Sequence, residues 1–228
     1  MKRYSLVLFD IDGTLMDFDQ TEDQALKQTV LSYDLAFTPE LVERYKRINA
    51  KWWKLLEEGK IRKAQIQDGR FADLWQELGL DIDPKESGLR YVERLEGSAF
   101  LYEGAAEICR SLAKRVKLAI VTNGIARVQH TRIAASGFAD CISAVLVSEE
   151  VGYAKPDSRY FEAALRACNH TEKEDVLIIG DSLPADIRGG NDFGIDTCWI
   201  NRAGLENTSG ITPTYTITHL NELEDMIP

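Results

Sequence analysis

Short, continuous apolar runs occur at the start of the chain and again after about residue 100. They are rich in β-branched residues and do not alternate with polar positions. Strands that are covered on both faces in a parallel sheet have this pattern. The pattern predicts buried strands at residues 6–9, 118–121, 144–147, 176–179 and 197–200.

Helical patterns separate these runs in the second half of the chain. Their apolar positions recur every three or four residues, as on one face of a helix. The predicted helices cover residues 104–115, 126–136, 158–168 and 184–193. Alternation of strand and helix is typical of an α/β protein with a doubly wound parallel sheet, a Rossmann-like core.

Residues 17–98 have a different pattern, with no convincing strand. One stripe at helical spacing consists of Leu41, Tyr45, Ile48, Trp52 and Leu55. Breaks near Pro39, Gly59, Gly79 and Pro84 separate about four helices. We therefore predict two domains: an α/β catalytic core from residues 1–16 and 99–228, and an all-helical cap from residues 17–98 inserted after the first strand.

Charge and cysteine usage narrow the classes of partner. The chain has 27 basic and 37 acidic side chains and a formal net charge of −10, so neither a nucleic-acid polymer nor a membrane is an expected partner. Its four cysteines show no metal-ligand spacing, which favours free thiols in a reducing compartment. We expect a cytoplasmic protein, and the sequence leaves monomer and homodimer open.

Ligands of open parallel sheets bind beyond the carboxyl ends of the strands, so the residues that follow each apolar run are the most informative ones. The first run ends in Asp10-Ile11-Asp12-Gly13. Two carboxylates at positions i and i+2 point to the same side while the chain stays extended. Gly13 then permits a sharp turn.

Three further segments carry groups suited to an anion or a metal. The second run ends in Thr122-Asn123-Gly124 before a helix, which supplies a hydroxyl and backbone N–H groups. Lys155-Pro156 precedes the helix at 158–168, and the proline would hold Lys155 extended toward the site. The fourth run ends in Gly180-Asp181-Ser182, with Asp186 five residues after Asp181.

These charges indicate phosphate chemistry that depends on a metal. A phosphate dianion beside Asp10, Asp12 and Asp181 needs counter-charge, which one Mg²⁺ and Lys155 would supply. Magnesium prefers oxygen ligands, and Asp10 and Asp181 fit that role. Asp10 could then attack phosphorus and form an aspartyl-phosphate. Asp12 would protonate the leaving oxygen and later deprotonate the hydrolytic water.

In this order, the segments resemble the motifs of the haloacid dehalogenase superfamily, and the resemblance spans nearly the whole chain. The matching segments are DxDGTL at 10–15, TNG at 122–124, KP at 155–156 and GDS with its later aspartate at 180–186. The resemblance implies that Asp10 is the nucleophile and Asp12 the general acid/base. It also implies metal ligation by Asp10, the Asp12 backbone carbonyl and Asp181, with one Mg²⁺ per chain; Mn²⁺ stays open as the metal in use.

The same resemblance assigns supporting roles around the phosphate. Thr122, Asn123 and Lys155 would hold the phosphoryl oxygens, and Asp186 would orient the metal's waters or Lys155. An alternative for Asp186 is simply to serve the first turn of the following helix, where acids are favoured. The alternative for Asp10 and Asp12 is a turn after the strand, because Asp-Gly favours turns.

Within the superfamily, an acid at Asp12 is found in phosphatases and phosphomutases and disfavours a dehalogenase. The segments Leu15–Glu22, Lys51–Gly59 and Gly180–Leu183 look like the pyrimidine 5′-nucleotidase branch, although Gly13 stands where that branch often has a second aspartate. We therefore expect a small phosphate ester as substrate, a pyrimidine nucleoside 5′-monophosphate first. Trp53, offset from the apolar stripe of the cap, is a candidate to stack on the base, although packing within the cap is the alternative.

Two other functions stay open. The first is a sugar-phosphate or phosphoglycolate phosphatase or a phosphomutase, because the same core motifs serve all of these. The second is a non-catalytic, phospholigand-binding regulatory protein that kept the fold. Such a protein would be expected to have lost one of Asp10, Asp12 or Asp181, yet all three are present.

Overall fold

The computed structural model describes residues 3–57 and 59–227. Within these residues, six parallel strands form one sheet in the order β3-β2-β1-β4-β5-β6. The strands are β1 (Leu6–Phe9), β2 (Lys117–Thr122), β3 (Ala144–Val147), β4 (Val176–Gly180), β5 (Asp196–Ile200) and β6 (Tyr215–Ile217). The predicted α/β class with a doubly wound parallel sheet is confirmed.

The pattern analysis missed β6 at the edge of the sheet. It has three residues, and only Ile217 of the three is buried. A short edge strand that is exposed on most of its length carries too few apolar positions to stand out in the sequence.

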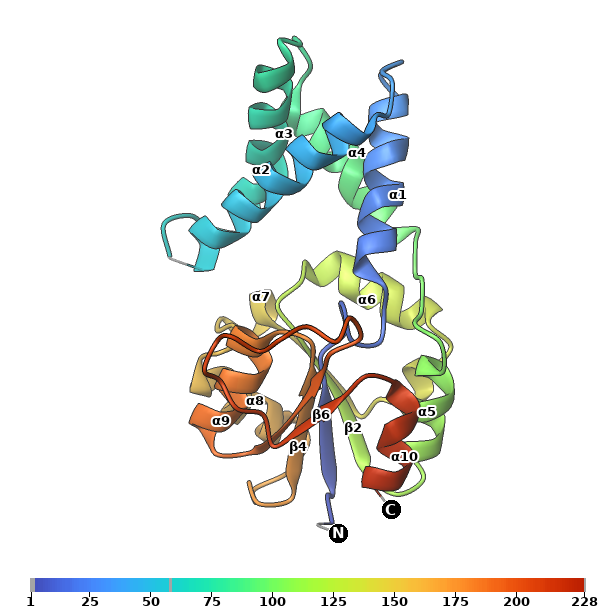
Figure 1. The fold of residues 1–228 in the computed structure, drawn as a ribbon, viewed down its shortest axis with the longest axis vertical. Helices are drawn as coiled ribbons and strands as arrows, with labels where there is room; N and C mark the ends of the chain where they lie inside the picture. The colour runs from blue at the N-terminus through green and yellow to red at the C-terminus, as the bar shows by residue number, and fades with distance from the viewer. Residues whose placement is uncertain (1–2, 58, 228) are drawn as a thin grey trace. The chain divides into compact units, whose positions relative to one another are not determined.

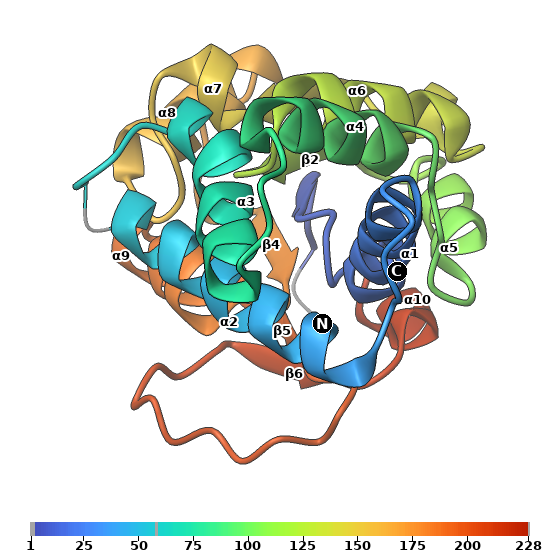
Figure 2. The same ribbon diagram turned by 90° about the horizontal axis from the view of Figure 1, so that it is seen from above.

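Helices cover both faces of the sheet, as Figures 1 and 2 show. One side carries α5 (Ala105–Leu112), α6 (Ala126–Ala135) and α10 (Leu223–Met226). The other side carries α7 (Ser148–Val151), α8 (Ser158–Ala167) and α9 (Arg188–Phe193). Short helical turns join these elements: η1 (Ala139–Cys141), the π-helical turn η2 (Leu183–Ile187) and η3 (Leu220–Glu222). The helix expected at 184–193 is therefore a π-helical turn followed by α9.

Burial on both faces explains why the strands are continuously apolar. Along β1, Val7 and Phe9 belong to the core beneath α5, whereas Leu6 and Leu8 belong to the core beneath α8. All four are 0% exposed. Side chains alternate between the faces of a strand, so a central strand between two helical layers needs an apolar residue at every position.

The chain forms two compact units, Met1–Phe18 with Ala99–Pro228, and Asp19–Ser98. The second unit contains most of α1 (Phe18–Leu31) together with α2 (Pro39–Glu57), α3 (Ala64–Leu78) and α4 (Pro84–Glu96). Its centre is an aromatic cluster made by Tyr45, Phe71, Trp75 and Tyr91. None of the helices in the described residues has both the length and the apolar character that a membrane span requires.

A buried polar chain also crosses this helical unit. Asn49 donates to Glu22 at 2.8 Å and accepts from Arg70 at 3.1 Å. The Arg70 guanidinium lies 4.3 Å from the ring centre of Tyr91. Burial raises the pKa of Glu22 to about 7, although the charge of Arg70 opposes the shift.

Candidate active site

The site lies at the carboxyl edge of the sheet, where its central strands end. Asp10 directly follows β1, Thr122 ends β2, and Asp181 directly follows β4. Strands β2 and β4 flank β1, so their carboxyl ends are neighbours, and the strand order reverses there. Parallel pairing therefore brings together side chains that lie far apart along the chain.

Lys155 connects several groups of the site through hydrogen bonds. Its ammonium donates to Asp10 Oδ1 at 2.6 Å, to Asp186 Oδ1 at 2.7 Å and to the Val121 carbonyl at 2.8 Å. The lysine side chain is 2% exposed. Three donors meet three acceptors, which fixes both the ammonium and the Asp10 carboxylate that it touches.

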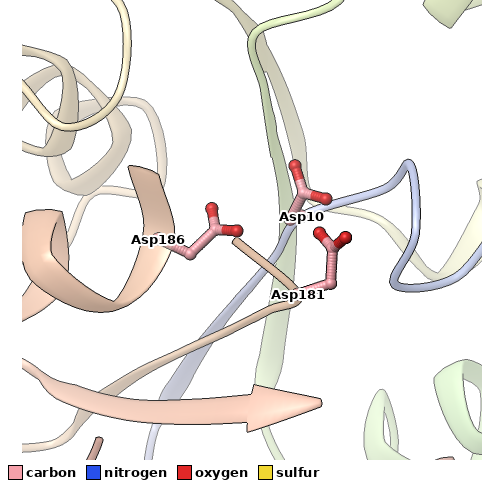
Figure 3. A group of neighbouring side chains, drawn as sticks. All are labelled: Asp10, Asp181 and Asp186. Atoms are coloured by element: carbon pink, nitrogen blue, oxygen red, sulfur yellow. The ribbon is translucent and has the colours of Figure 1, made fainter. Parts of the chain in front are cut away.

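The carboxylates of Asp10, Asp181 and Asp186 lie close together, as Figure 3 shows. One oxygen from each lies within 4.8 Å of the others. Asp186 is 1% exposed, and its Oδ2 accepts from the Ser182 N–H at 3.1 Å. Both of its oxygens are therefore engaged by protein donors, whereas Asp181 is exposed. This difference favours Asp181 over Asp186 as a metal ligand and assigns Asp186 to Lys155. Asp10 also accepts on both oxygens, from Lys155 and from the Thr14 hydroxyl, but the Thr14 contact is long at 3.3 Å, so Asp10 Oδ2 is the weakly held oxygen of the cluster.

The electrostatics of the cluster fit a divalent cation. Burial raises the pKa of Asp10 well above its ordinary value, although Lys155 lowers it. Asp181 keeps an exposed side, but partial burial, with Asp186 adding to it, raises its pKa to about 7. For Lys155, burial alone lowers the pKa, but Asp10 and Asp186 outweigh burial and raise it. Three carboxylates against one ammonium leave excess negative charge, which a hard cation with oxygen preference would balance.

Thr122 and Asn123 connect the second strand to this cluster. The Thr122 hydroxyl oxygen accepts from the Gly124 N–H at 3.0 Å and from Gln129 Nε2 at 3.1 Å, so its own proton can be donated to a ligand. The Asn123 side chain donates to the Lys155 carbonyl and accepts from the Lys155 N–H, both at 2.9 Å. Asn123 therefore fixes the backbone of Lys155.

Two residues of the site were missed by the sequence analysis. Arg132 donates to Asp12 Oδ1 at 2.6 Å, and Gln129 donates to Asp12 Oδ2 at 2.5 Å. Both lie on the buried face of α6, together with Val128 and Ile133. Polar residues at core positions of a helix that follows a candidate anion-binding turn were the signal that could have identified them.

Arg202 is a third missed residue, and it fixes the turn after Asp12. It donates to the carbonyls of Gly13 and Thr14, both at 2.6 Å, and its guanidinium lies 3.6 Å from the ring centre of Tyr102. Gly13 has φ +79°, and a Cβ there would lie 2.2 Å from Asp181 Oδ2. The turn thus passes close against Asp181.

Trp53 lies in α2, within the helical unit, and its side chain is partly exposed. Its predicted contact with a substrate base stays a prediction. The neighbouring Trp52 packs against α3, where its ring leaves no room for a Cβ at Gly69, and its indole N–H donates to Asp73 at 3.0 Å.

Comparison with known proteins agrees with this fold. Residues 4–194 match the family model of the haloacid dehalogenase-like hydrolases, described as a hydrolase family. The chain therefore belongs to this family and is a hydrolase by descent.

Several relatives are similar over nearly the full length. The HAD-hydrolase YfnB of Bacillus subtilis is 37% identical, covering 98% of this chain and 95% of that protein. The pyrimidine 5′-nucleotidase YjjG of Escherichia coli is 32% identical, covering 99% and 98%. The pyrimidine 5′-nucleotidase PynA of Streptococcus pneumoniae is 37% identical, covering 98% and 95%. The predicted resemblance to the nucleotidase branch of the family is confirmed.

Solved structures are similar to this chain as well. The crystal structure of YfnB, described as bound to magnesium, superposes with a TM-score of 0.93 at 36% identity and covers 99% of both chains.

Proposed function

We propose that this hydrolase is a magnesium-dependent phosphomonoesterase that forms an aspartyl-phosphate on Asp10. The observation that carries the proposal is the position of the Asp10 carboxylate. It lies 2.6 Å from the buried Lys155 ammonium and within a cluster formed with Asp181 and Asp186. A carboxylate placed between a fixed cation and a candidate metal site is equipped to attack phosphorus, because the charge of the phosphate is offset there.

The metal would be held by the carboxylates of Asp10 and Asp181 and by the backbone carbonyl of Asp12. When bound, Mg²⁺ supplies positive charge that offsets the phosphate and the carboxylates. Lys155 would contribute a second positive charge, Thr122 a hydroxyl donor, and Asn123 the fixed backbone of Lys155. Asp186 would hold Lys155 in place.

The reaction would proceed in two displacements. Asp10 forms a bond to phosphorus while the bond to the leaving oxygen breaks, and Asp12 gives that oxygen its proton. In the second step Asp12 takes a proton from water, the water oxygen bonds to phosphorus, and the bond to Asp10 breaks. Inorganic phosphate leaves, and Asp12 is protonated again for the next cycle.

The proposed substrates are pyrimidine nucleoside 5′-monophosphates. Support comes from the relatives YjjG and PynA, both of which are pyrimidine 5′-nucleotidases and similar over nearly the whole chain. Trp53 would stack on the pyrimidine ring. Sugar phosphates, phosphoglycolate and transfer to a second hydroxyl remain the alternatives for the same core.

A substrate panel with purified protein tests the proposal. We expect Mg²⁺-dependent phosphate release from uridine and thymidine monophosphates to exceed release from purine nucleotides, sugar phosphates and phosphoglycolate. Asp10→Asn is expected to abolish release while leaving the circular dichroism spectrum unchanged. Release by Asp10→Asn would refute the nucleophile, and faster turnover of sugar phosphates would refute the nucleotidase assignment. No turnover of any ester would favour a regulatory phospholigand-binding protein.

A further inference from the structure

The Asp12 carboxylate is held by two side chains of one helix. Arg132 Nη1 donates to its Oδ1 at 2.6 Å, and Gln129 Nε2 donates to its Oδ2 at 2.5 Å. Both donors lie on α6, three residues apart, which places them on the same helix face. Each carboxylate oxygen thus has its own donor from the same rigid element.

Both donors approach Asp12 from its buried side. Arg132 is 0% exposed and Gln129 is 1% exposed, whereas the Asp12 side chain is 24% exposed. The carboxylate is therefore anchored on one side and open on the other. A general acid/base needs this arrangement, because it must be held at a fixed angle and still reach a leaving oxygen or a water.

Burial of the Arg132 guanidinium at this position is energetically costly. Among the residues that the structure describes, its Nε and Nη2 have no hydrogen-bond partner. Its guanidinium lies 5.7 Å from the ring centre of Phe18 and forms an ion pair with Asp12. Buried charges that serve stability are normally fully hydrogen-bonded. An incompletely satisfied guanidinium aimed at Asp12 points to a role in what Asp12 does.

Gln129 also connects Asp12 to the predicted phosphate-binding hydroxyl. Its amide nitrogen donates to Thr122 Oγ1 at 3.1 Å as well as to Asp12. The amide passes so close to Gly124 that a Cβ there would lie 2.0 Å from Nε2. The Gly124 N–H is the second donor to Thr122, so the hydroxyl oxygen accepts twice and its proton is available to donate to a ligand.

We propose that Gln129 and Arg132 form a clamp that positions Asp12 for proton transfer, with Gln129 also orienting the Thr122 hydroxyl. The inference rests on the phosphatase function proposed above. Neither Gln129 nor Arg132 exchanges a proton during the reaction. Asp12 gives its proton to the leaving oxygen and recovers one from water, and the clamp fixes the angle from which it does so. Gln129 and Arg132 are positioning residues, since they act through Asp12 and Thr122.

A comparison of leaving groups tests the clamp. The value of kcat/KM reports the steps up to formation of the aspartyl-phosphate, in which Asp12 protonates the leaving oxygen. Simple alkyl phosphates need that proton, whereas p-nitrophenolate leaves without it. For Arg132→Met we expect kcat/KM to fall about 100-fold with an alkyl phosphate and less than about threefold with p-nitrophenyl phosphate. Arg132→Lys should recover part of the loss, because it restores a donor to Asp12.

Further variants separate the two parts of the clamp. Gln129→Met should also lower kcat/KM more with the alkyl phosphate than with p-nitrophenyl phosphate. In addition, kcat/KM should fall with both substrates, because Thr122 also loses a donor. In an Asp12→Asn background, Arg132→Met should cause no further loss with the alkyl phosphate, because coupled residues are not additive. Arg127→Met, at an exposed position of the same helix, is the matched control and should leave both values unchanged.

The outcomes distinguish the clamp from the function on which it rests. An equal loss with both substrates in Arg132→Met, or a full loss in the Asp12→Asn background, would overturn the clamp and leave the phosphatase intact. A wild-type protein that releases phosphate from neither substrate would overturn the phosphatase and the clamp together. If thermal melting shows that Arg132→Met is unfolded, Arg132→Lys and Gln129→Met provide the test. The quantity compared is again the loss of kcat/KM with the alkyl phosphate relative to the loss with p-nitrophenyl phosphate.

Discussion

The Lys155 ammonium lies 2.6 Å from Asp10 Oδ1, although the two residues are 145 positions apart in the chain. Both side chains are nearly inaccessible, with 2% and 10% of their surfaces exposed. A charge pair in so little water is strongly coupled, so each residue decides the orientation and the ionisation of the other. The nucleophile of the proposed reaction is therefore set by a residue from a distant loop.

Removal of Lys155 should impair both chemistry and stability. Lys155→Gln leaves Asp10 and Asp186 without their buried counter-charge, so we expect kcat to fall at least about 100-fold and the free energy of unfolding to fall by about 3 kcal/mol. Steady-state kinetics and urea unfolding measure the two effects. Lys114→Gln, at an exposed lysine, should change neither. A Lys155→Gln enzyme with more than a tenth of the wild-type kcat would contradict the proposed role.

Asn123 should act through the backbone of Lys155. Asn123→Ala removes both hydrogen bonds to that backbone, so we expect kcat to fall about tenfold as Lys155 loses its fixed position, with a stability loss of about 1–2 kcal/mol. Asn191→Ala is a matched control, because Asn191 also makes two side-chain hydrogen bonds, to Thr212 and Thr197. It should lower stability and leave kcat alone. Equal effects of the two variants on kcat would argue against a specific role.

The adjacent tryptophans of α2 should have separable effects. Trp53→Leu is expected to raise KM for pyrimidine nucleotides about tenfold, because a base–aromatic stack is worth roughly 1–3 kcal/mol, and to leave KM for p-nitrophenyl phosphate unchanged. Trp52→Leu should lower the free energy of unfolding by about 2 kcal/mol, because Trp52 packs on α3 and bonds Asp73. If Trp53→Leu lowers stability as much as Trp52→Leu and leaves the nucleotide KM unchanged, Trp53 is a packing residue.

Glu22 should make the stability of the helical unit depend on pH. Its pKa is raised from 4.5 to about 7 in the folded chain, so the folded state binds more protons than the unfolded state between these values. Stability should therefore fall as pH rises from about 4.5 to about 7, by up to roughly 3 kcal/mol.

Urea unfolding at pH 5 and pH 8 measures this change. Glu22→Gln removes the contribution of Glu22 and should weaken the pH dependence over that interval. The contributions of Asp10 and Asp181, whose pKa values burial also raises, should remain. Glu43→Gln, at an exposed position of α2, serves as the control and should keep the wild-type profile. Parallel profiles for wild type and Glu22→Gln would show that another group carries the dependence.

Much of the fold and the outline of the site could be predicted from the sequence. Continuous apolar runs identified β1 to β5, because strands that are covered on both faces bury both alternating sets of side chains, and these side chains are mostly apolar. The carboxyl ends of parallel strands share one edge of a sheet, so the sequence predicts that Asp10, Thr122 and Asp181 lie close together. Glycine and proline residues likewise predicted where the four helices of residues 17–98 are separated.

The sequence by itself thus determined the order of the elements and the residues at their ends. Local hydrophobic patterns and parallel strand pairing are sufficient to predict both. Only the tertiary structure decided which polar side chains are buried and which partners they meet. Arg132 reaches Asp12 across 120 positions, and Arg202 reaches Gly13 across 189. Such contacts depend on how helices pack on the sheet, and one-dimensional periodicity carries no information about that packing. The same reason applies to Glu22, whose raised pKa follows from burial among helices that only the folded chain brings together.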